Sequence, residues 1–358
     1  MLETLLQREA QWLSGEGPEA DVAVYSLCQL FRNLADFPFP SQCTDDERQT
    51  IEERVLGVLD SLNLLATGQY WSFADLDERE RRFLVERRLV RPQLLDAEGA
   101  RGVYIADDQS FSININDENH LTFNGLASGL QIHEIWSRMS LIDDTLAGVL
   151  DYAFSERLGY LTAEIGQVGT GLLASVVLHL PGSHLTNRVS NAVNMAREKR
   201  HTLESIVVPK AIMPIDARPP NGSALGDLHK LTNSSTLGRS EEETLFHLKH
   251  LALDLIKSER ESREQIVSDA PLQLEDRVGR ALGLARGARL LAFHEANSVL
   301  SSLRLGVSSG LLDQFSLHQI NDVLMGSQNA HIEMKCGHDC DELTLSAERA
   351  DLFRSRFA

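Results

Sequence analysis

The 358-residue sequence contains no uninterrupted apolar run of the roughly 18 residues that a membrane-spanning helix requires. Its first residues, MLETLLQREAQWL, include acidic side chains where a secretory leader would have a basic segment followed by an apolar one. Both absences argue against a membrane span and against secretion. We therefore expect a cytoplasmic protein.

Cysteine and positive charge are also scarce. Four cysteines are too few for a disulfide framework in a chain of this length, which fits a reducing compartment. The sequence has 34 Lys and Arg residues against 52 Asp and Glu residues, which gives a formal net charge of -18. Because nucleic acids and anionic membranes require a basic surface, this balance argues against both as partners and favours neutral or basic proteins.

A chain of 358 residues is long enough for two or three packed domains, and its 42% content of hydrophobic residues is enough for their cores. Residues 1–91 have apolar positions at helical spacing, and we expect them to form a small N-terminal helical lobe. Residues 92–260 differ, because short apolar or alternating segments, such as 111–115 and 175–180, are interleaved with helical patterns. This mixture is typical of an antiparallel sheet flanked by helices, an α+β domain.

The last part of the chain is helical in pattern. Ser240 and Glu243 have the spacing of a capping box, which predicts that a helix begins there and leads out of the sheet domain. A polar stretch at 257–271 follows, and apolar positions at helical spacing then continue to the end. We expect a C-terminal helical domain over residues 269–358.

The most distinctive segment, residues 158–181, reads LGYLTAEIGQVGTGLLASVVLHLP. It resembles the phosphagen (guanidino) kinase family, and most closely the bacterial protein-arginine kinases. In that family a Gly-Tyr-Leu-Thr turn, a reactive-cysteine loop, a Gly-Thr-Gly-x-Arg-Ala-Ser-Val segment and a Leu-His-Leu-Pro strand end follow one another. The resemblance implies a guanidino-kinase fold, which is glutamine-synthetase-like. The matching residues are Gly159, Tyr160, Leu161, Thr162, Gly169, Thr170, Gly171, Ala174, Ser175, Val176, Leu178, His179, Leu180 and Pro181.

The resemblance covers nearly the whole chain. VERRLVRPQLL at 85–95, SININDENHLTF at 112–123 and LTNSSTLGRSEEE at 231–243 are each similar to segments of the same family. LEDRVGRALGLARGARLL at 274–291 resembles the extra C-terminal domain that bacterial protein-arginine kinases have and ordinary phosphagen kinases lack. This last match indicates the bacterial branch.

The positions that bind nucleotide phosphates in the family are altered here. Phosphoryl transfer from ATP needs charge neutralisation and alignment, which the family provides with arginines. Arg32 is retained, and Arg218 could substitute in part, although the prolines that follow it oppose a flexible loop. We expect no cofactor, and Mg-ATP only if the phosphate site has been rearranged. The residues that stand at the other arginine positions are Leu27, Gln29, Thr122, Leu173 and Ile215.

One functional carboxylate is retained. Glu118, with Asp117 beside it, stands where the family has the glutamate that orients the substrate guanidinium and accepts its proton. Alternatively, residues 116–120 are kept because the turn needs their hydrogen bonds. Glu164 replaces the reactive cysteine of the family, and Ser346 replaces the aspartate of its phosphoarginine-reading segment. The resemblance therefore implies that both of these sites are degenerate, since a neutral hydroxyl is a poor partner for a guanidinium.

Two further patterns have simpler explanations. Cys336, His338 and Cys340 offer thiolate and imidazole ligands, but they lie too close together for the usual zinc spacing, and we expect no metal site. Gly169 and Gly171 resemble a phosphate loop, but the lysine of a Walker motif is absent. We expect these glycines to allow a close approach to the sheet.

The sequence leads to three hypotheses. The first is a catalytically impaired protein-arginine kinase homologue, a pseudokinase that acts through protein contacts. The second is an active protein-arginine phosphotransferase whose rearranged phosphate site uses Arg32, Arg87 or Arg218. The third is a binding module for arginine-rich or phosphoarginine-bearing proteins. The resemblance implies a homodimer or pairing with an active arginine kinase, and contact with a zinc-finger activator or a Clp-type unfoldase in protein quality control.

Overall fold

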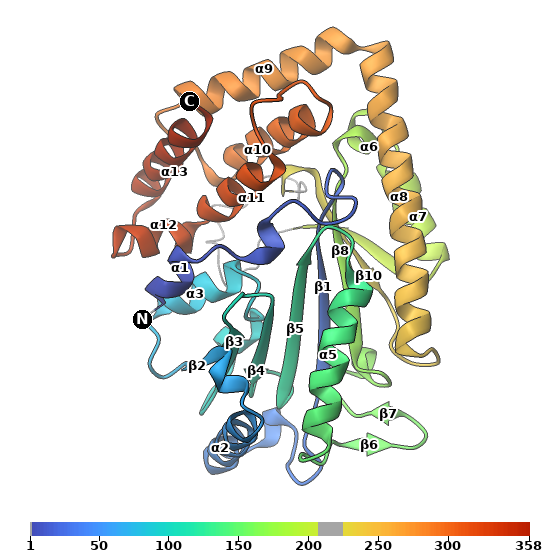
Figure 1. Ribbon diagram of the computed structural model, residues 1–358, viewed down its shortest axis with the longest axis vertical. Helices are drawn as coiled ribbons and strands as arrows, with labels where there is room; N and C mark the ends of the chain where they lie inside the picture. The colour runs from blue at the N-terminus through green and yellow to red at the C-terminus, as the bar shows by residue number, and fades with distance from the viewer. Residues whose placement is uncertain (1, 207–224) are drawn as a thin grey trace.

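The computed structural model describes residues 2–206 and 225–358. Within these residues, eight strands form one antiparallel sheet in the order β2-β3-β4-β5-β1-β8-β10-β9 (Figure 1). A short hairpin of β6 (Phe154–Ser155) and β7 (Gly159–Tyr160) lies outside it. The strands of the sheet are β1 (Ala23–Arg32), β2 (Gly68–Ser72), β3 (Gly102–Ala106), β4 (Phe111–Ile115), β5 (Leu121–Ser128), β8 (Leu172–His179), β9 (His201–Ser205) and β10 (Leu228–Asn233).

The expectation of a purely helical lobe over residues 1–91 is wrong. This part of the chain does contain α1 (Glu3–Gln7), α2 (Asp45–Ser61) and α3 (Glu78–Glu86), but it also supplies the edge strand β2 and the central strand β1. All but one of the β1 residues are buried, because β1 is covered on both faces of the sheet. Such a strand lacks the alternation of a half-buried strand, so its pattern resembles any buried segment.

Two hydrophobic cores lie on opposite faces of the sheet. One is built with α2, α5 (Ile132–Ala147), α7 (Val189–Glu198) and α8 (Glu241–Asp269), and it includes Leu30 of β1. The other is built with α3, the N-terminal segment around Trp12 and part of the C-terminal domain, and it includes Leu27 of β1. Packing on both faces confirms the predicted α+β class. The short α4 (Gln93–Asp96) joins the second core.

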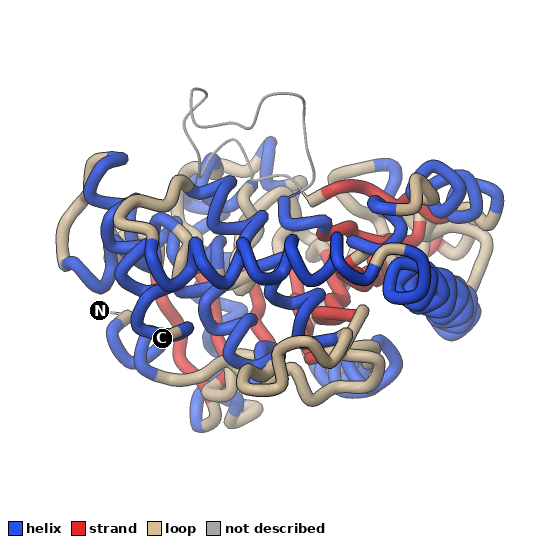
Figure 2. Tube along the Cα trace, turned by 90° about the horizontal axis from the view of Figure 1, so that it is seen from above, coloured by secondary structure: helices blue, strands red, loops and turns tan. Residues whose placement is uncertain are grey.

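The C-terminal helices surround a core of their own, as predicted. They lie across one end of the sheet (Figure 2), and Val278, Leu303 and Phe353 are among the residues buried between them. None of the described helices is both long enough and apolar enough to cross a membrane. The helices of this domain are α9 (Pro271–Gly287), α10 (Phe293–Ser308), α11 (Leu317–Gly326), α12 (Asn329–Cys336) and α13 (Glu342–Phe357).

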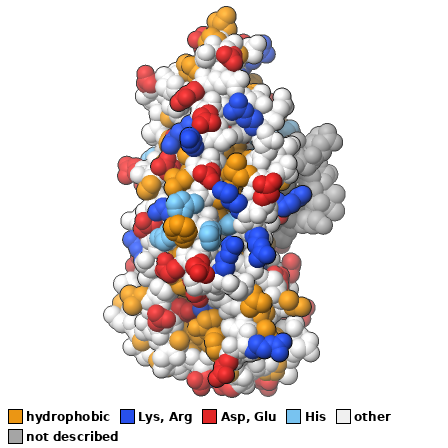
Figure 3. All heavy atoms as spheres, turned by 90° about the vertical axis from the view of Figure 1, so that its right-hand side faces the viewer, with side chains coloured by type: hydrophobic (Ala, Val, Ile, Leu, Met, Phe, Trp, Pro, Cys, Tyr) orange, Lys and Arg blue, Asp and Glu red, His pale blue; other side chains and the backbone are white. Residues whose placement is uncertain are grey.

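Helix α8 connects the sheet to these C-terminal helices. It begins at the predicted capping box, where the side chains of Ser240 and Glu243 bond each other's backbone N–H groups. It then continues through the polar stretch to Asp269, because several of the polar residues there are buried against the rest of the protein. The side of the molecule formed by α7 and α8 carries acidic and basic side chains side by side (Figure 3), so the net negative charge is not concentrated there.

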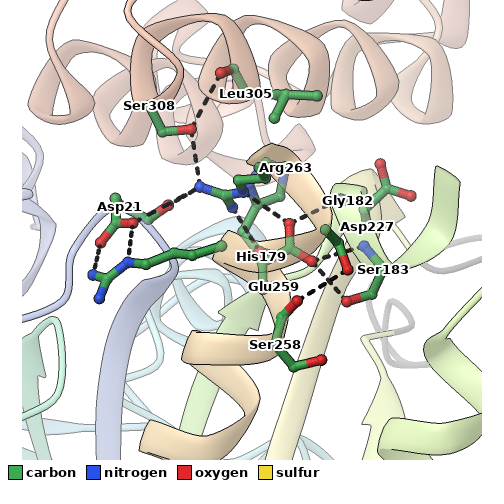
Figure 4. Close-up of polar contacts among 12 residues, drawn as sticks. Asp21, His179, Gly182, Ser183, Asp227, Ser258, Glu259, Arg263, Leu305 and Ser308 are labelled. Atoms are coloured by element: carbon green, nitrogen blue, oxygen red, sulfur yellow. Dashed lines mark hydrogen bonds and ion pairs between the residues drawn. The ribbon is translucent and has the colours of Figure 1, made fainter. Parts of the chain in front are cut away.

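The polar residues of α8 tie the two parts together. Glu259, which is entirely buried, accepts hydrogen bonds from the backbone N–H groups of Gly182 and Ser183, both at 2.8 Å, at the start of α6 (Pro181–Leu185). It also pairs with Arg263 at 2.8 Å, and Arg263 donates to the His179 carbonyl and to the Ser308 hydroxyl of α10 (Figure 4). We call this group of residues the joint.

Candidate active site

Four of the five positions at which the resemblance places phosphate-binding arginines lie together on the sheet. Gln29 of β1 pairs with Leu173 of β8, Leu27 precedes Gln29 by two residues, and Thr122 of β5 pairs with Phe31 of β1. Side chains of residues that pair across antiparallel strands point to the same face. The structure therefore brings all four to one face of the sheet, which we call the site face.

The site face is neutral and internally hydrogen bonded at these positions. Gln29 Nε2 donates to Asn124 Oδ1 at 2.8 Å, and Asn124 Nδ2 donates to Ser112 Oγ at 3.3 Å. Thr122 is completely buried, and its hydroxyl donates to Asp117 Oδ1 at 2.9 Å. Because none of the four side chains carries a positive charge, they offer a nucleotide phosphate no counter-charge.

Arg32 is the retained arginine, and it points away from the site face. Its guanidinium pairs with Asp143 of α5 at 2.7 Å and lies 3.4 Å from the centroid of the Tyr160 ring. It also donates to the carbonyls of Phe31 and Thr170, at 2.9 and 3.0 Å, and the residue is only 1% exposed. Arg32 thus links β1, α5 and β7, and the structure does not place it where it could contact a nucleotide.

The other two arginines of the second hypothesis gain no support as phosphate contacts. The buried Arg87 donates to the carbonyls of Leu5 and Arg8, at 2.6 and 3.2 Å, so it holds the N-terminal segment against α3. Burial lowers the pKa of Arg87 to about 10. Arg218, like the degenerate position Ile215, lies outside the described residues.

The two retained carboxylates lie in the turn between β4 and β5. Asn116 has a positive φ of 58°, and Asp117 Oδ1 accepts the backbone N–H of Asn119 at 2.8 Å. The Asp117 side chain is wholly buried, whereas that of Glu118 is 33% exposed. The hydrogen bonds of the turn agree with the structural explanation for Asn116, Asp117 and Asn119. They do not involve the Glu118 carboxylate, which faces another partner.

That partner is Arg91, a residue that the sequence did not single out. Arg91 Nη2 donates to Glu118 Oε2 at 3.0 Å, and Nη1 lies 3.7 Å from Asp117 Oδ2. The guanidinium carbon lies 4.9 Å from the centroid of the Phe31 ring, and the backbone N–H of Arg91 donates to Asn114 Oδ1 at 3.0 Å. Burial raises the pKa of Asp117, and the charge of Arg91 opposes that rise. The retained carboxylates are therefore already paired with the guanidinium of Arg91.

Two cations besides Arg91, namely Lys230 and Arg88, lie near the site face. Lys230 of β10 pairs with Val177 of β8, which in turn pairs with Tyr25 of β1, so Lys230 belongs to the same face as Leu27. Burial, with the nearby charges of Arg88 and Arg91, lowers the pKa of Lys230 to about 8. No local sequence pattern indicates this cluster, because its members come from segments about 140 residues apart.

Glu164 and Ser346, which stand at the positions of the family's reactive cysteine and of its phosphoarginine reader, form their side-chain hydrogen bonds with Gln167 and Glu342. Glu164 is exposed, and its carboxylate accepts a hydrogen bond from Gln167 at 2.8 Å. Ser346 is buried in α13, and its hydroxyl lies 3.4 Å from Glu342 Oε1, one turn earlier in the same helix. The backbone N–H of Ala163, next to Glu164, donates to Asn119 Oδ1 at 2.9 Å, so Glu164 lies beside the turn that carries Glu118.

The glycines and the short Cys-His-Cys segment have local explanations. Gly171 has a φ of +68°, and a side-chain carbon there would lie 2.8 Å from the carbonyl oxygen of Phe31 in β1, so the predicted close approach to the sheet is confirmed at this position. At Gly169, with a φ of +119°, such a carbon would lie 2.2 Å from the carbonyl oxygen of Thr236, which follows β10 and is not part of the sheet. In the Cys-His-Cys segment, Cys340 Sγ lies 3.9 Å from His338 Nδ1. Within the described residues, one group of side chains is spaced closely enough to share a metal ion, and it consists of Glu9, His318 and Asp322 rather than of this segment.

Comparison with known proteins finds two family models that match this chain. A family model described as the C-terminal catalytic domain of ATP:guanido phosphotransferases matches residues 50–262. A second, described as the protein-arginine kinase McsB C-terminal domain, matches residues 271–358. The protein-arginine kinase of Symbiobacterium thermophilum is 33% identical over 99% of both chains. That of Halalkalibacterium halodurans is 34% identical over 96% of this chain and 94% of its own.

Solved structures show the same fold. A lombricine kinase crystal structure, 20% identical, matches with a TM-score of 0.57 over 69% of this chain and 68% of its own. The duplicated taurocyamine kinase of Schistosoma mansoni with bound components of a transition-state analogue is also 20% identical. It matches with a TM-score of 0.59 over 78% of this chain and 39% of its own. The predicted guanidino-kinase fold is confirmed.

Proposed function

Because the chain belongs to the protein-arginine kinase branch of the ATP:guanido phosphotransferase family, we propose that it is a catalytically impaired member of that branch. It acts through contacts with other proteins rather than by phosphoryl transfer. The observation that supports this proposal is the site face itself, where Leu27, Gln29, Thr122 and Leu173 leave the phosphate positions without a cation.

The energetic cost of these replacements is large. A hydrogen bond between an arginine and a phosphate contributes at least about 1.5 kcal/mol. Four such bonds would contribute about 6 kcal/mol together, which corresponds to roughly four orders of magnitude in affinity. If an active relative binds Mg-ATP in the micromolar range, the same site without these arginines would therefore bind it too weakly to matter at cellular concentrations.

The protein contacts follow from the branch to which the chain belongs. We propose a homodimer or a pairing with an active arginine kinase, with regulation of that kinase as the outcome. A zinc-finger activator or a Clp-type unfoldase is a further candidate partner. The net charge of -18 favours a partner with a basic surface.

The test is calorimetric titration of the full chain with Mg-ATP at near-physiological salt, together with an arginine-phosphorylation assay on a model protein. We expect neither micromolar binding nor transfer. The matched control is the double variant Gln29→Arg/Leu173→Arg, which returns two cations to half-buried, paired positions. It should bind Mg-ATP roughly a hundredfold more tightly than the natural chain, because two bonds restore about 3 kcal/mol. Micromolar binding with transfer by the natural chain would overturn the proposal.

The alternative is an active kinase with a rearranged phosphate site, and the observation in its favour is the position of Lys230. This residue is half-buried on the same face as Leu27, and its pKa is lowered first by burial and then by the neighbouring charges of Arg88 and Arg91. If the natural chain does transfer phosphate, Lys230→Met should abolish both transfer and Mg-ATP binding. Lys257→Met, at an exposed position of α8, should leave both unchanged.

A further inference from the structure

The site around Glu118 has the chemistry of a guanidinium receptor. A guanidinium is recognised by carboxylates that accept its planar N–H groups and by an aromatic face on which it stacks. Glu118 and Asp117 provide the carboxylates, and the Phe31 ring provides the aromatic face. All three are occupied by one guanidinium, that of Arg91.

This site is incompletely satisfied and open on one side. Among the described residues, Asp117 Oδ2 and Arg91 Nη1 have no hydrogen-bond partner, although both are buried, and they lie 3.7 Å apart. The Arg91 side chain is 10% exposed, whereas the Glu118 carboxylate that holds it is one-third exposed. A guanidinium from outside could therefore reach Glu118 if Arg91 moved aside.

We propose that Arg91 is a built-in pseudosubstrate. Its guanidinium occupies a subsite, formed by Glu118, Asp117 and Phe31, that takes an arginine side chain of a protein partner when Arg91 leaves. The inference rests on the proposed function in placing the substrate side of the site at Glu118. Beyond the proposed function, Arg91 is the side chain that fills this subsite when no partner is bound, and the binding concerned is that of a guanidinium without any nucleotide.

The charges of the site make the two guanidiniums exclude each other. Without Arg91, Asp117 is a wholly buried carboxylate that has lost its opposing charge, which is unfavourable. An incoming guanidinium restores that charge, but it needs the same Phe31 ring and the same Glu118 carboxylate that Arg91 already contacts. Arg91 therefore competes directly with an arginine side chain of a partner.

The experiment uses the full chain carrying Arg91→Ala and measures binding of two probes, methylguanidinium and a blocked Gly-Arg-Gly peptide. Calorimetry and thermal unfolding are run without nucleotide at matched ionic strength. We expect saturable 1:1 binding of both probes and a higher unfolding temperature of the variant with probe. The natural chain should bind at least tenfold more weakly, and methylammonium and a blocked Gly-Lys-Gly peptide should bind at least tenfold more weakly than the arginine probes.

Two control variants locate the site. Arg91→Ala/Glu118→Gln should lose at least tenfold in affinity for both probes, because it removes the exposed carboxylate. Arg88→Ala removes the neighbouring arginine, which forms no ion pair among the described residues, and should not create a binding site. If Arg91→Ala does not fold, Arg91→Lys takes its place, and the probes should then bind saturably at higher concentration by displacing the ammonium.

Three results would overturn the proposal. The first is equal peptide binding by the natural chain and by the Arg91 variant. The second is a variant that takes up methylguanidinium but excludes the peptide, since the ion pair would then be a closed structural contact. The third is a folded variant that binds neither probe. Phosphate transfer by the natural chain would instead overturn the proposed function and would leave these three outcomes unaffected.

Discussion

Replacing Glu259 by glutamine should loosen the joint between the sheet and the C-terminal helices. The substitution keeps the volume of the side chain but removes its charge and turns one acceptor oxygen into a donor. Glu259 accepts four hydrogen bonds, from Gly182 N, from Ser183 N and Oγ, and from Arg263 Nε, at 2.7 to 2.8 Å. Whichever way the new amide is oriented, its NH₂ group faces a group that also donates.

The expected loss is about 3 kcal/mol. Removing one member of a buried ion pair typically costs about 3 to 5 kcal/mol, because the other member remains as a buried charge. The lower figure applies here, since Arg263 keeps its hydrogen bonds to His179 O and Ser308 Oγ, and Asp21 lies 3.9 Å away.

Urea unfolding at pH 7.5 measures this loss as a change in the apparent free energy of unfolding. The matched control is Glu264→Gln, which removes an exposed carboxylate from the same helix and should change stability by less than about 0.5 kcal/mol. Hydrogen exchange should also quicken in α6 and α10, the elements that the joint holds. A Glu259→Gln protein within about 1 kcal/mol of the natural chain would refute the reasoning from buried charge.

Two more predictions concern pH and backbone geometry. Burial lowers the pKa of His120 to about 4, and its Nδ1 accepts the Leu34 N–H at 2.9 Å. Below about pH 6.5, the His120 side chain is therefore protonated in the unfolded chain but stays neutral in the folded chain. Between about pH 6.5 and 4, this group should lower the free energy of unfolding by about 1.4 kcal/mol for each pH unit that the pH falls. In urea unfolding from pH 7.5 to 5.0, His120→Gln should reduce the pH dependence of the free energy of unfolding by that amount, and an unchanged dependence would contradict the assignment. In thermal unfolding, Gly169→Ala should destabilise the protein by more than about 1 kcal/mol. Gly279→Ala is the control, because nothing lies within 4 Å of the added carbon in α9, and it should stabilise the protein by up to about 1 kcal/mol. Equal effects of the two substitutions would contradict the need for glycine at position 169.

Much of the fold was accessible from local patterns. The capping box at Ser240 and the short alternating or apolar segments at 111–115 and 175–180 predicted where α8, β4 and β8 lie. The central strand β1 was missed because both of its faces are covered, which removes the period of two from its sequence. The extension of α8 to Asp269 depends on buried polar side chains, and composition alone makes such a stretch resemble an exposed loop.

The site was predictable only where a position could be compared with a family motif. Gln29 and Leu173 were identified in that way, and the register of β1 and β8 then pairs them. The pairing of Arg91 with Glu118 links residues 27 positions apart, and the approach of Lys230 to Arg88 depends on the topology of the sheet. No local pattern encodes contacts of that kind.

The uninterrupted course of α8 also sets a rule for recombining this chain with its relatives. At about 1.5 Å per residue, its 29 residues reach about 43 Å, and the helix ends between the two segments that the family models match. Each residue inserted before Asp269 would turn everything that follows by about 100°, and four residues would turn it by about 40° and shift it by about 6 Å. Chimeras that keep the number of residues in α8 should therefore keep their C-terminal helices packed against the rest of the protein. Natural length variation should fall after Asp269 rather than within α8.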